Sequence, residues 1–234
     1  MPPANRSTSG AMRPLVMLHG GLSSRMDWIA LTPTLAAGRE LLVIDTRGHG
    51  DSTLEDGSFS YSQFASDVIR VLDHLQIDTF DMLGWSDGAN TALSLAYQYP
   101  ARTGYTIIIS ANIDPSGLTP KAREMIARID SNGWSLTRLL HWVLSSDKGN
   151  WPLLVTKTAI LWTQHSVLSL AQIGQIRTPV LLITSSEDDV ELSHSRALST
   201  ALTDCKLVVL EGVGHQIPHS VPGHVLNLID DFLL

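Results

Sequence analysis

One serine and one histidine each follow a short apolar run, and together they could carry out acyl transfer. Ser86 is the centre of Gly-Trp-Ser-Asp-Gly at 84–88, the G-x-S-x-G pattern that puts a serine on a sharp strand-to-helix turn. His215 ends the glycine-rich segment Glu-Gly-Val-Gly-His. A serine hydroxyl is a weak nucleophile at neutral pH, so it needs a base to take its proton. This pair predicts attack of the Ser86 hydroxyl on a carbonyl carbon, with His215 as the base.

The base needs an acidic partner that fixes its tautomer, and an acidic cluster lies between the two residues in the chain. Residues 185–189 read Ser-Ser-Glu-Asp-Asp, which offers Glu187, Asp188 and Asp189. The serine, the acidic cluster and the histidine each come just after an apolar strand candidate. An open sheet of alternating strands and helices carries its site at the carboxyl ends of the strands. We therefore expect the three groups to meet at one edge of a sheet.

Short apolar runs alternate with longer amphipathic ones along most of the chain, which predicts a mostly parallel sheet of about six strands with helices on both faces. The expected strands are Leu15–Leu18, Glu40–Ile44, Thr79–Leu83, Tyr105–Ser110, Val180–Thr184 and Lys206–Leu210. The expected core helices are Met26–Ala37, Tyr61–Leu75, Asp87–Tyr99, Glu191–Leu202 and Val221–Leu233. Gly84 and Gly88 flank the serine because the turn between strand and helix leaves no room there for a Cβ.

A helical insertion interrupts this rhythm and divides the chain. Residues 1–14 are expected to be a flexible lead-in, 15–112 and 177–234 an α/β core, and 113–176 a small helical cap. The expected cap helices are Thr119–Asp130, Leu136–Ser146, Trp151–His165 and Val167–Ile173. The cap holds four tryptophans, which form either a small local core or part of an apolar pocket over the sheet edge: Trp134, Trp142, Trp151 and Trp162.

Composition excludes several other classes of protein. The 234 residues carry a net charge of −7, whereas a nucleic-acid binder usually has a basic face. The lone Cys205 excludes an intramolecular disulfide, and the polar start of the chain is not a secretory signal. No run is long and apolar enough to cross a bilayer, and no histidine and cysteine cluster has metal-ligand spacing. We expect a cytoplasmic protein with no metal, cofactor, nucleic acid or membrane partner, and the sequence indicates no oligomeric state.

Four segments in order resemble the α/β-hydrolase superfamily from Leu15 onward. The first expected strand ends in His-Gly-Gly at 19–21, similar to the superfamily's oxyanion loop, and the second ends in Asp-Thr-Arg-Gly-His-Gly-Asp-Ser at 45–52, similar to its D-x-R-G-x-G-x-S turn. The 84–88 segment resembles that of the biphenyl hydrolase-like (valacyclovir hydrolase) group. The Val-Gly-His turn that ends at His215 lies where the superfamily carries its histidine. The resemblance implies the α/β-hydrolase fold and a serine hydrolase.

The resemblance also implies a role for each site residue. Ser86 attacks the substrate and His215 moves the proton. Asp189 orients His215, because the superfamily usually shows G-x-x-D after this strand and Ser-Glu-Asp-Asp at 186–189 fits if serine replaces the glycine. Asp188 and Glu187 stay open as alternative acids. The backbone N–H groups of Gly21 and Asp87 form the oxyanion hole.

The side chain of Asp87 has two interpretations. It is either a solvated or helix-capping carboxylate in the first turn of a helix, or a negative charge at the pocket rim that attracts a cationic substrate. The expected function is cleavage of a small carboxylic ester, with a lactone or an activated amide as further substrates, through an acyl-enzyme. The alternatives are a carbon–carbon bond hydrolase of ring-cleavage products, an acyltransferase and a non-catalytic ligand-binding homologue.

Overall fold

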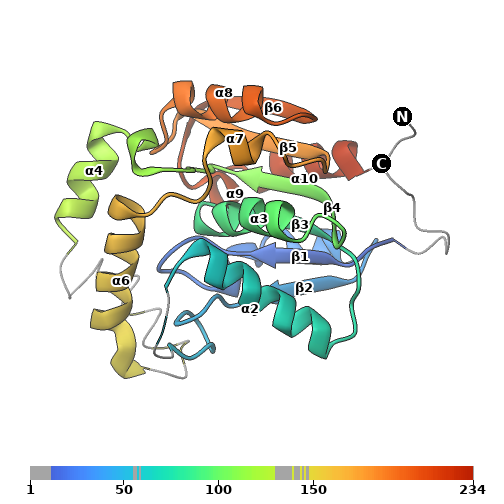
Figure 1. Cartoon of the computed structure of the whole chain (residues 1–234), viewed down its shortest axis with the longest axis horizontal. Coiled ribbons are helices and arrows are strands. Elements are labelled where there is room, and N and C mark those ends of the chain that lie inside the picture. The colour runs from blue at the N-terminus through green and yellow to red at the C-terminus, as the bar shows by residue number, and fades with distance from the viewer. Residues whose placement is uncertain are drawn as a thin grey trace.

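A six-stranded parallel sheet is the centre of the protein (Figure 1). The computed structural model describes residues 12–54, 57, 59–129, 139, 143, 145 and 148–233. The strands lie in the order β2-β1-β3-β4-β5-β6, and every neighbouring pair is parallel. They are β1 (Leu15–Leu18), β2 (Leu41–Ile44), β3 (Phe80–Trp85), β4 (Thr103–Ile109), β5 (Val180–Glu187) and β6 (Cys205–Gly214). The predicted parallel sheet of about six strands is confirmed.

Helices cover both faces of the sheet, as the continuous apolar strands require. One face packs against α2 (Tyr61–His74), α3 (Asp87–Gln98), α7 (Leu170–Ile173) and α8 (Leu192–Ala201). The other packs against a 3-10 helix (Arg25–Trp28), α1 (Thr32–Leu35), α9 (Ile217–Ser220) and α10 (Pro222–Leu233). The strands contribute alternate residues to these two layers. In β1, Val16 and Leu18 pack on the first face, whereas Leu15 and Met17 pack on the second.

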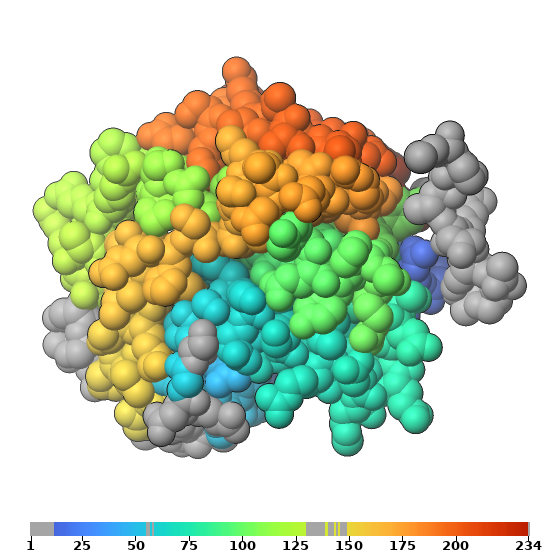
Figure 2. Space-filling view, viewed as in Figure 1, coloured from blue at the N-terminus to red at the C-terminus, as the bar shows by residue number. Residues whose placement is uncertain are grey.

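The described part of the 113–176 insertion is helical. It contains α4 (Pro120–Ala127), α6 (Trp151–Gln164), α7 and two 3-10 helices, Pro115–Gly117 and Lys148–Asn150. The helices α4 and α6 lie beyond one end of the sheet, whereas α7 packs on its face. Figure 1 shows α4 and α6 at the end towards which the strands point, and Figure 2 shows their atoms lying against the core there. Among the described residues, no helix has the length and apolar character needed to span a bilayer.

Several elements differ from the sequence-based expectation at their ends. The expected helix Met26–Ala37 is two short pieces, the 3-10 helix and α1. Strands β5 and β6 run past their expected ends, to Glu187 and Gly214. The longer β5 ends directly before Asp188, and the longer β6 ends directly before His215. The following predictions lie largely or wholly outside the described residues: the lead-in up to residue 11, the helix Leu136–Ser146, Trp134 and Trp142.

Two glycines allow α3 to pack tightly where β3 ends. A Cβ at Gly84 would meet the backbone of Gly88 and Ala89, and a Cβ at Gly88 would lie inside contact distance of the Leu18 carbonyl oxygen. The expectation that a side chain would clash at Gly84 and Gly88 is confirmed. This close approach fixes the start of α3 directly beside the end of β1.

Gly88→Ala is therefore expected to lower the free energy of unfolding by about 3 kcal/mol or more, because backbone rather than a flexible side chain blocks the new methyl group. Urea denaturation followed by circular dichroism measures the loss. Gly149→Ala is the matched control, since a Cβ there meets nothing within 4 Å. Equal stability of the two variants would contradict the packing argument.

Candidate active site

Ser86 lies on the turn between β3 and α3 in a conformation that side-chain-bearing residues rarely adopt. Its φ is 54° and its ψ is −114°. Its carbonyl accepts the Asn90 N–H at 3.0 Å, so the turn is tied to the first turn of the helix. Such backbone strain is typical of functional sites, where surrounding structure holds it in place. The turn presents Ser86 to a cavity between the sheet edge and the cap.

Ser86, His215 and Asp188 form a chain of two hydrogen bonds. The Ser86 hydroxyl donates to Nε2 of His215 over 3.1 Å, and Nδ1 of His215 donates to Oδ1 of Asp188 over 2.6 Å. The three residues follow or end β3, β6 and β5, so the parallel sheet brings them to one edge. A hydroxyl bonded to an imidazole that is oriented by a carboxylate is the arrangement that activates a serine nucleophile.

The prediction that Asp189 orients His215 is wrong, because the carboxylate on Nδ1 belongs to Asp188. Strand β5 continues to Glu187, with a register irregularity between Ser185 and Glu187. Asp188 is therefore the first residue after the strand, and its side chain turns inward and is fully buried. Asp189 instead lines the cavity, and its carbonyl accepts the Thr119 N–H at 2.9 Å.

A buried serine on β4's carboxyl end holds the second oxygen of Asp188. The Ser110 hydroxyl donates to Oδ2 of Asp188 at 2.5 Å, and Thr184 also donates to that oxygen at 3.3 Å. Burial alone would raise the pKa of Asp188, but the hydrogen bonds from His215 and Ser110 outweigh it and hold the pKa below its usual value. The carboxylate is thus kept ionised in a buried place.

Trp85, which precedes Ser86, holds His215 in place through a hydrogen bond and a ring contact. The Trp85 indole N–H donates to the His215 carbonyl at 3.0 Å, and the two rings lie 5.5 Å apart. Burial lowers the pKa of His215, but the hydrogen bond and the charge of Asp188 outweigh it, so the pKa lies above its usual value. Asp188 therefore stabilises the cation that His215 becomes when it takes a proton.

The expected oxyanion loop is fixed by buried side chains. Nδ1 of His19 lies 2.6 Å from the Gly20 carbonyl, and its Nε2 accepts a backbone N–H from the turn after β2 at 2.9 Å. The Gly20 N–H donates to Asp27 at 3.1 Å, and the Leu22 N–H donates to Nε2 of His49 at 3.0 Å. His19 therefore joins this loop to the turn after β2. Gly21 lies between these anchors and lines the cavity.

Asp87 is buried rather than solvated, with 7% of its surface exposed. Its Oδ1 accepts the Tyr61 hydroxyl at 2.8 Å, and its two oxygens accept the Trp162 indole N–H at 2.9 and 3.0 Å. Burial raises the pKa of Asp87, although these hydrogen bonds oppose the shift. Asp87 is also the first residue of α3, so its N–H is among the helix's donors without an intrahelical acceptor.

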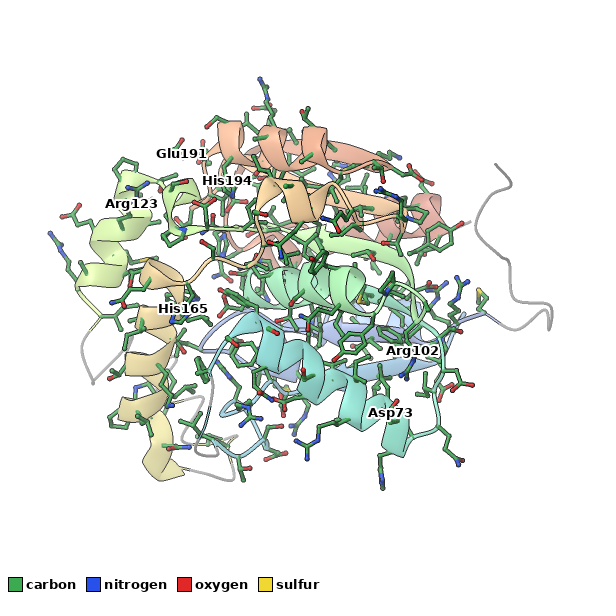
Figure 3. The ribbon with its side chains drawn as sticks, viewed as in Figure 1. Asp73, Arg102, Arg123, His165, Glu191 and His194 are labelled. Carbon is green, nitrogen blue, oxygen red and sulfur yellow. The ribbon has the colours of Figure 1, made fainter. Side chains whose placement is uncertain are left out.

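The cavity in front of Ser86 has a volume of about 280 Å³, which suits a small substrate. Trp162 lines it, so at least one cap tryptophan belongs to a pocket, and His165 lies at the end of α6 that reaches the cavity (Figure 3). The cap side of the cavity is mainly apolar, with Leu118, Ala122, Met125, Ile126 and Leu161. Asp189 also lines the cavity, beside the cap residues Leu118 and Thr119.

Comparison with known proteins identifies the family. A sequence model of the alpha/beta hydrolase family matches residues 15–227. The chain belongs to the alpha/beta hydrolase family. It is 26% identical to a 2-hydroxymuconate semialdehyde hydrolase from Pseudomonas sp. (strain CF600), over 98% of this chain and 89% of that protein. It is 32% identical to a putative 2-succinyl-6-hydroxy-2,4-cyclohexadiene-1-carboxylate synthase from Bacillus subtilis, over 95% and 91%.

Solved structures share the alpha/beta hydrolase fold. The solved structure described as Est816, an N-acyl homoserine lactone degrading enzyme, superposes with a TM-score of 0.77 at 23% identity, over 95% of this chain and 94% of that one. The expected α/β-hydrolase fold is therefore confirmed, and the relatives support a hydrolase.

The sequence analysis of this alpha/beta hydrolase missed three contacts of the site. Ser110 donates to Asp188, and Tyr61 and Trp162 donate to Asp87. Ser110 follows β4, so the rule that sites lie at carboxyl strand ends could have found it. Tyr61 reads as one apolar position of an amphipathic helix, and nothing in its spacing points to Asp87.

Proposed function

We propose that the protein is a serine hydrolase that cleaves small, uncharged carboxylic esters through an acyl-enzyme, with lactones and activated amides as further substrates. The observation that carries the proposal is the hydrogen-bonded chain from Ser86 through His215 to Asp188, which opens on a small cavity. We assign Ser86 as nucleophile, His215 as general base and acid, and Asp188 as the group that orients His215.

The reaction follows from these contacts. The Ser86 oxygen bonds to the acyl carbon while its proton moves to Nε2 of His215. The tetrahedral intermediate collapses, the ester bond breaks, and His215 returns the proton to the leaving alcohol. A water molecule then gives a proton to His215 and attacks the acyl carbon; the bond to the Ser86 oxygen breaks, the acid leaves, and His215 returns the proton to Ser86.

The negative oxygen of each intermediate needs donors that are already aimed at it. We assign this role to the backbone N–H groups of Gly21 and Asp87. Both residues line the cavity with Ser86, and the Asp87 N–H lies at the positive end of α3. The buried anchors of Gly20 and Leu22 support the assignment, because they limit movement of the residue between them.

The charges around the cavity favour an uncharged substrate over the ring-cleavage products of the carbon–carbon bond alternative. The carboxylates of Asp188, Asp189 and Asp87 all favour the charged form of His215, and among the described residues that line the cavity none is lysine or arginine. The substrate named for the 2-hydroxymuconate semialdehyde hydrolase is a carboxylate. A carboxylate on the substrate would be repelled here.

Two measurements test the proposed function. A fluorophosphonate probe should label Ser86 of the wild-type protein, as identified by peptide mass spectrometry, and p-nitrophenyl butyrate should give a burst followed by turnover. The hemisuccinate of p-nitrophenol has the same four-carbon acyl chain with a terminal carboxylate, and its kcat/KM should be at least about tenfold lower. Absent labelling and turnover would favour a ligand-binding homologue, and equal or faster hemisuccinate cleavage would favour an anionic substrate.

The activity should fall in acid with an apparent pKa above the usual histidine value of about 6.5. His215 must be neutral to take the Ser86 proton, and Asp188 stabilises its charged form, so protonation sets in at a higher pH than for a free histidine. The pH profile of kcat/KM for p-nitrophenyl butyrate between pH 5 and 9 measures this limb, with Tm followed at each pH as the control for unfolding. An apparent pKa below about 6.5 would contradict the assignment.

A further inference from the structure

The turn Gly20–Gly21 lies against two indole rings. A Cβ on Gly20 would lie 2.9 Å from two carbons of the Trp85 ring, and a Cβ on Gly21 would lie 2.5 Å from a carbon of the Trp162 ring. These distances are shorter than carbon atoms tolerate, so both rings touch the bare backbone of the turn. Trp85 is the last residue of β3 and directly precedes Ser86, whereas Trp162 belongs to the cap helix α6. One ring thus comes from the core and the other from the cap.

The Trp162 ring has its own fixed support. Its N–H donates to both oxygens of the buried Asp87, and Tyr61 on α2 donates to the same carboxylate. Asp87 directly follows Ser86 in the chain. The carboxylate would also meet a Cβ on Gly21, so the turn packs on Asp87 as well as on the ring that Asp87 holds. The cap helix, the serine turn and the oxyanion loop therefore converge on one hydrogen-bonded group.

We propose that Trp162 is a positioning residue through which the cap helix α6 sets the Gly21 N–H for the oxyanion. This inference rests on the proposed function. The Asp87 carboxylate acts as the acceptor that seats the indole, rather than as a charge that selects a cationic substrate. The ring that touches Gly21 belongs to α6, so the position of this cap helix and the alignment of the Gly21 N–H are coupled. Loss of the contact between Trp162 and Gly21 should lower kcat more than it changes KM, because the negative charge on the substrate oxygen develops only in the transition state.

Trp162→Phe tests the proposal, because it keeps an aromatic ring and removes the N–H that Asp87 accepts. We expect kcat for p-nitrophenyl butyrate to fall about tenfold to a hundredfold, the range that a displacement near 1 Å produces, with KM changed less than about threefold. The dissociation constant of a phenylboronic acid, which mimics the tetrahedral intermediate on Ser86, should rise by the same factor as kcat falls. Trp151→Phe is the matched control, since it removes an indole from the same helix at a residue that does not line the cavity.

Two substitutions of Asp87 separate its acceptor role from its charge. Asp87→Asn keeps an oxygen that can accept the Trp162 N–H, whereas Asp87→Ala removes it. We expect Asp87→Asn to retain kcat within about threefold to fivefold and Asp87→Ala to lose as much as Trp162→Phe. A role of Asp87 through charge predicts instead that both substitutions have the same effect, which would overturn the proposal.

The remaining outcomes also decide the question. If fluorophosphonate labels the wild type and Trp162→Phe equally fast and kcat is unchanged, the positioning role fails while the proposed function stands. If Trp162→Phe raises KM and lowers Tm without changing kcat, the ring only stabilises the cap and the proposal fails. If the wild type itself is neither labelled nor active, the proposed function is what fails.

Discussion

Asp188→Asn is expected to lower kcat on the order of 10⁴-fold, whereas Asp189→Asn is expected to change it less than about threefold. The reason is geometric. Oδ1 of Asp188 accepts the Nδ1 proton of His215 at 2.6 Å, and an asparagine amide placed there can favour the tautomer in which Nε2 carries the proton. In that tautomer Nε2 has no lone pair for the Ser86 proton. Asp189 faces the cavity and contributes only its charge to His215.

The two substitutions are matched in chemistry and differ by one position in the chain. Steady-state kinetics with p-nitrophenyl butyrate give kcat for each variant, and urea denaturation shows whether Asp188→Asn still folds. If it does not, Ser110→Ala tests the same carboxylate more gently, because it removes one donor from Oδ2 of Asp188. A larger loss of kcat in Asp189→Asn than in Asp188→Asn would mean that Asp189 orients His215, as the G-x-x-D resemblance implies.

Replacing Ser86 by alanine or glycine is expected to abolish turnover, and the glycine variant is expected to be the more stable of the two. Both Ser86→Ala and Ser86→Gly should lower kcat by about 10⁵-fold to 10⁶-fold, because each removes the nucleophile. Their stabilities should differ. At a φ of 54° and ψ of −114° a side chain is strained by about 1–3 kcal/mol, and glycine is not. Glycine loses more backbone freedom on folding, which offsets about 0.5–1 kcal/mol of this gain. The free energy of unfolding of Ser86→Gly should therefore exceed that of Ser86→Ala by about 1 kcal/mol.

This difference corresponds to a rise in Tm of about 2–4 °C for a chain of this length. Differential scanning calorimetry of the two variants measures it, and the fluorophosphonate probe confirms that neither reacts at residue 86. A Ser86→Gly variant less stable than Ser86→Ala would mean that the turn carries no strain. Residual turnover within a hundredfold of the wild type would mean that another nucleophile acts.

The hydrolase fold was predictable because its signals are local. The apolar strands and amphipathic helices are each visible within a dozen residues, and each of the six strands has at least one end within a residue of its expected place. Ser86 and His215 were predictable for the same reason, since each directly follows a strand within a short glycine-containing motif. The parallel order then forces their strands to deliver them to the same edge.

The acid was not predictable to one residue, because neighbouring residues in extended chain point to opposite sides. Choosing between Asp188 and Asp189 depends on where β5 ends and on the irregularity after Ser185, which arises from pairing with β6. Pairing between distant segments leaves no mark in the spacing of the acidic cluster itself.

The sequence by itself determined the sheet, the nucleophile and the base, since periodicity and short motifs act within one segment. Only the tertiary structure decided which carboxylate reaches His215, and that Tyr61 and Trp162 bury Asp87. These contacts join residues from separate elements, up to 75 positions apart. Their free energy depends on the distance and burial that packing produces, and a linear pattern of residue types does not contain either quantity.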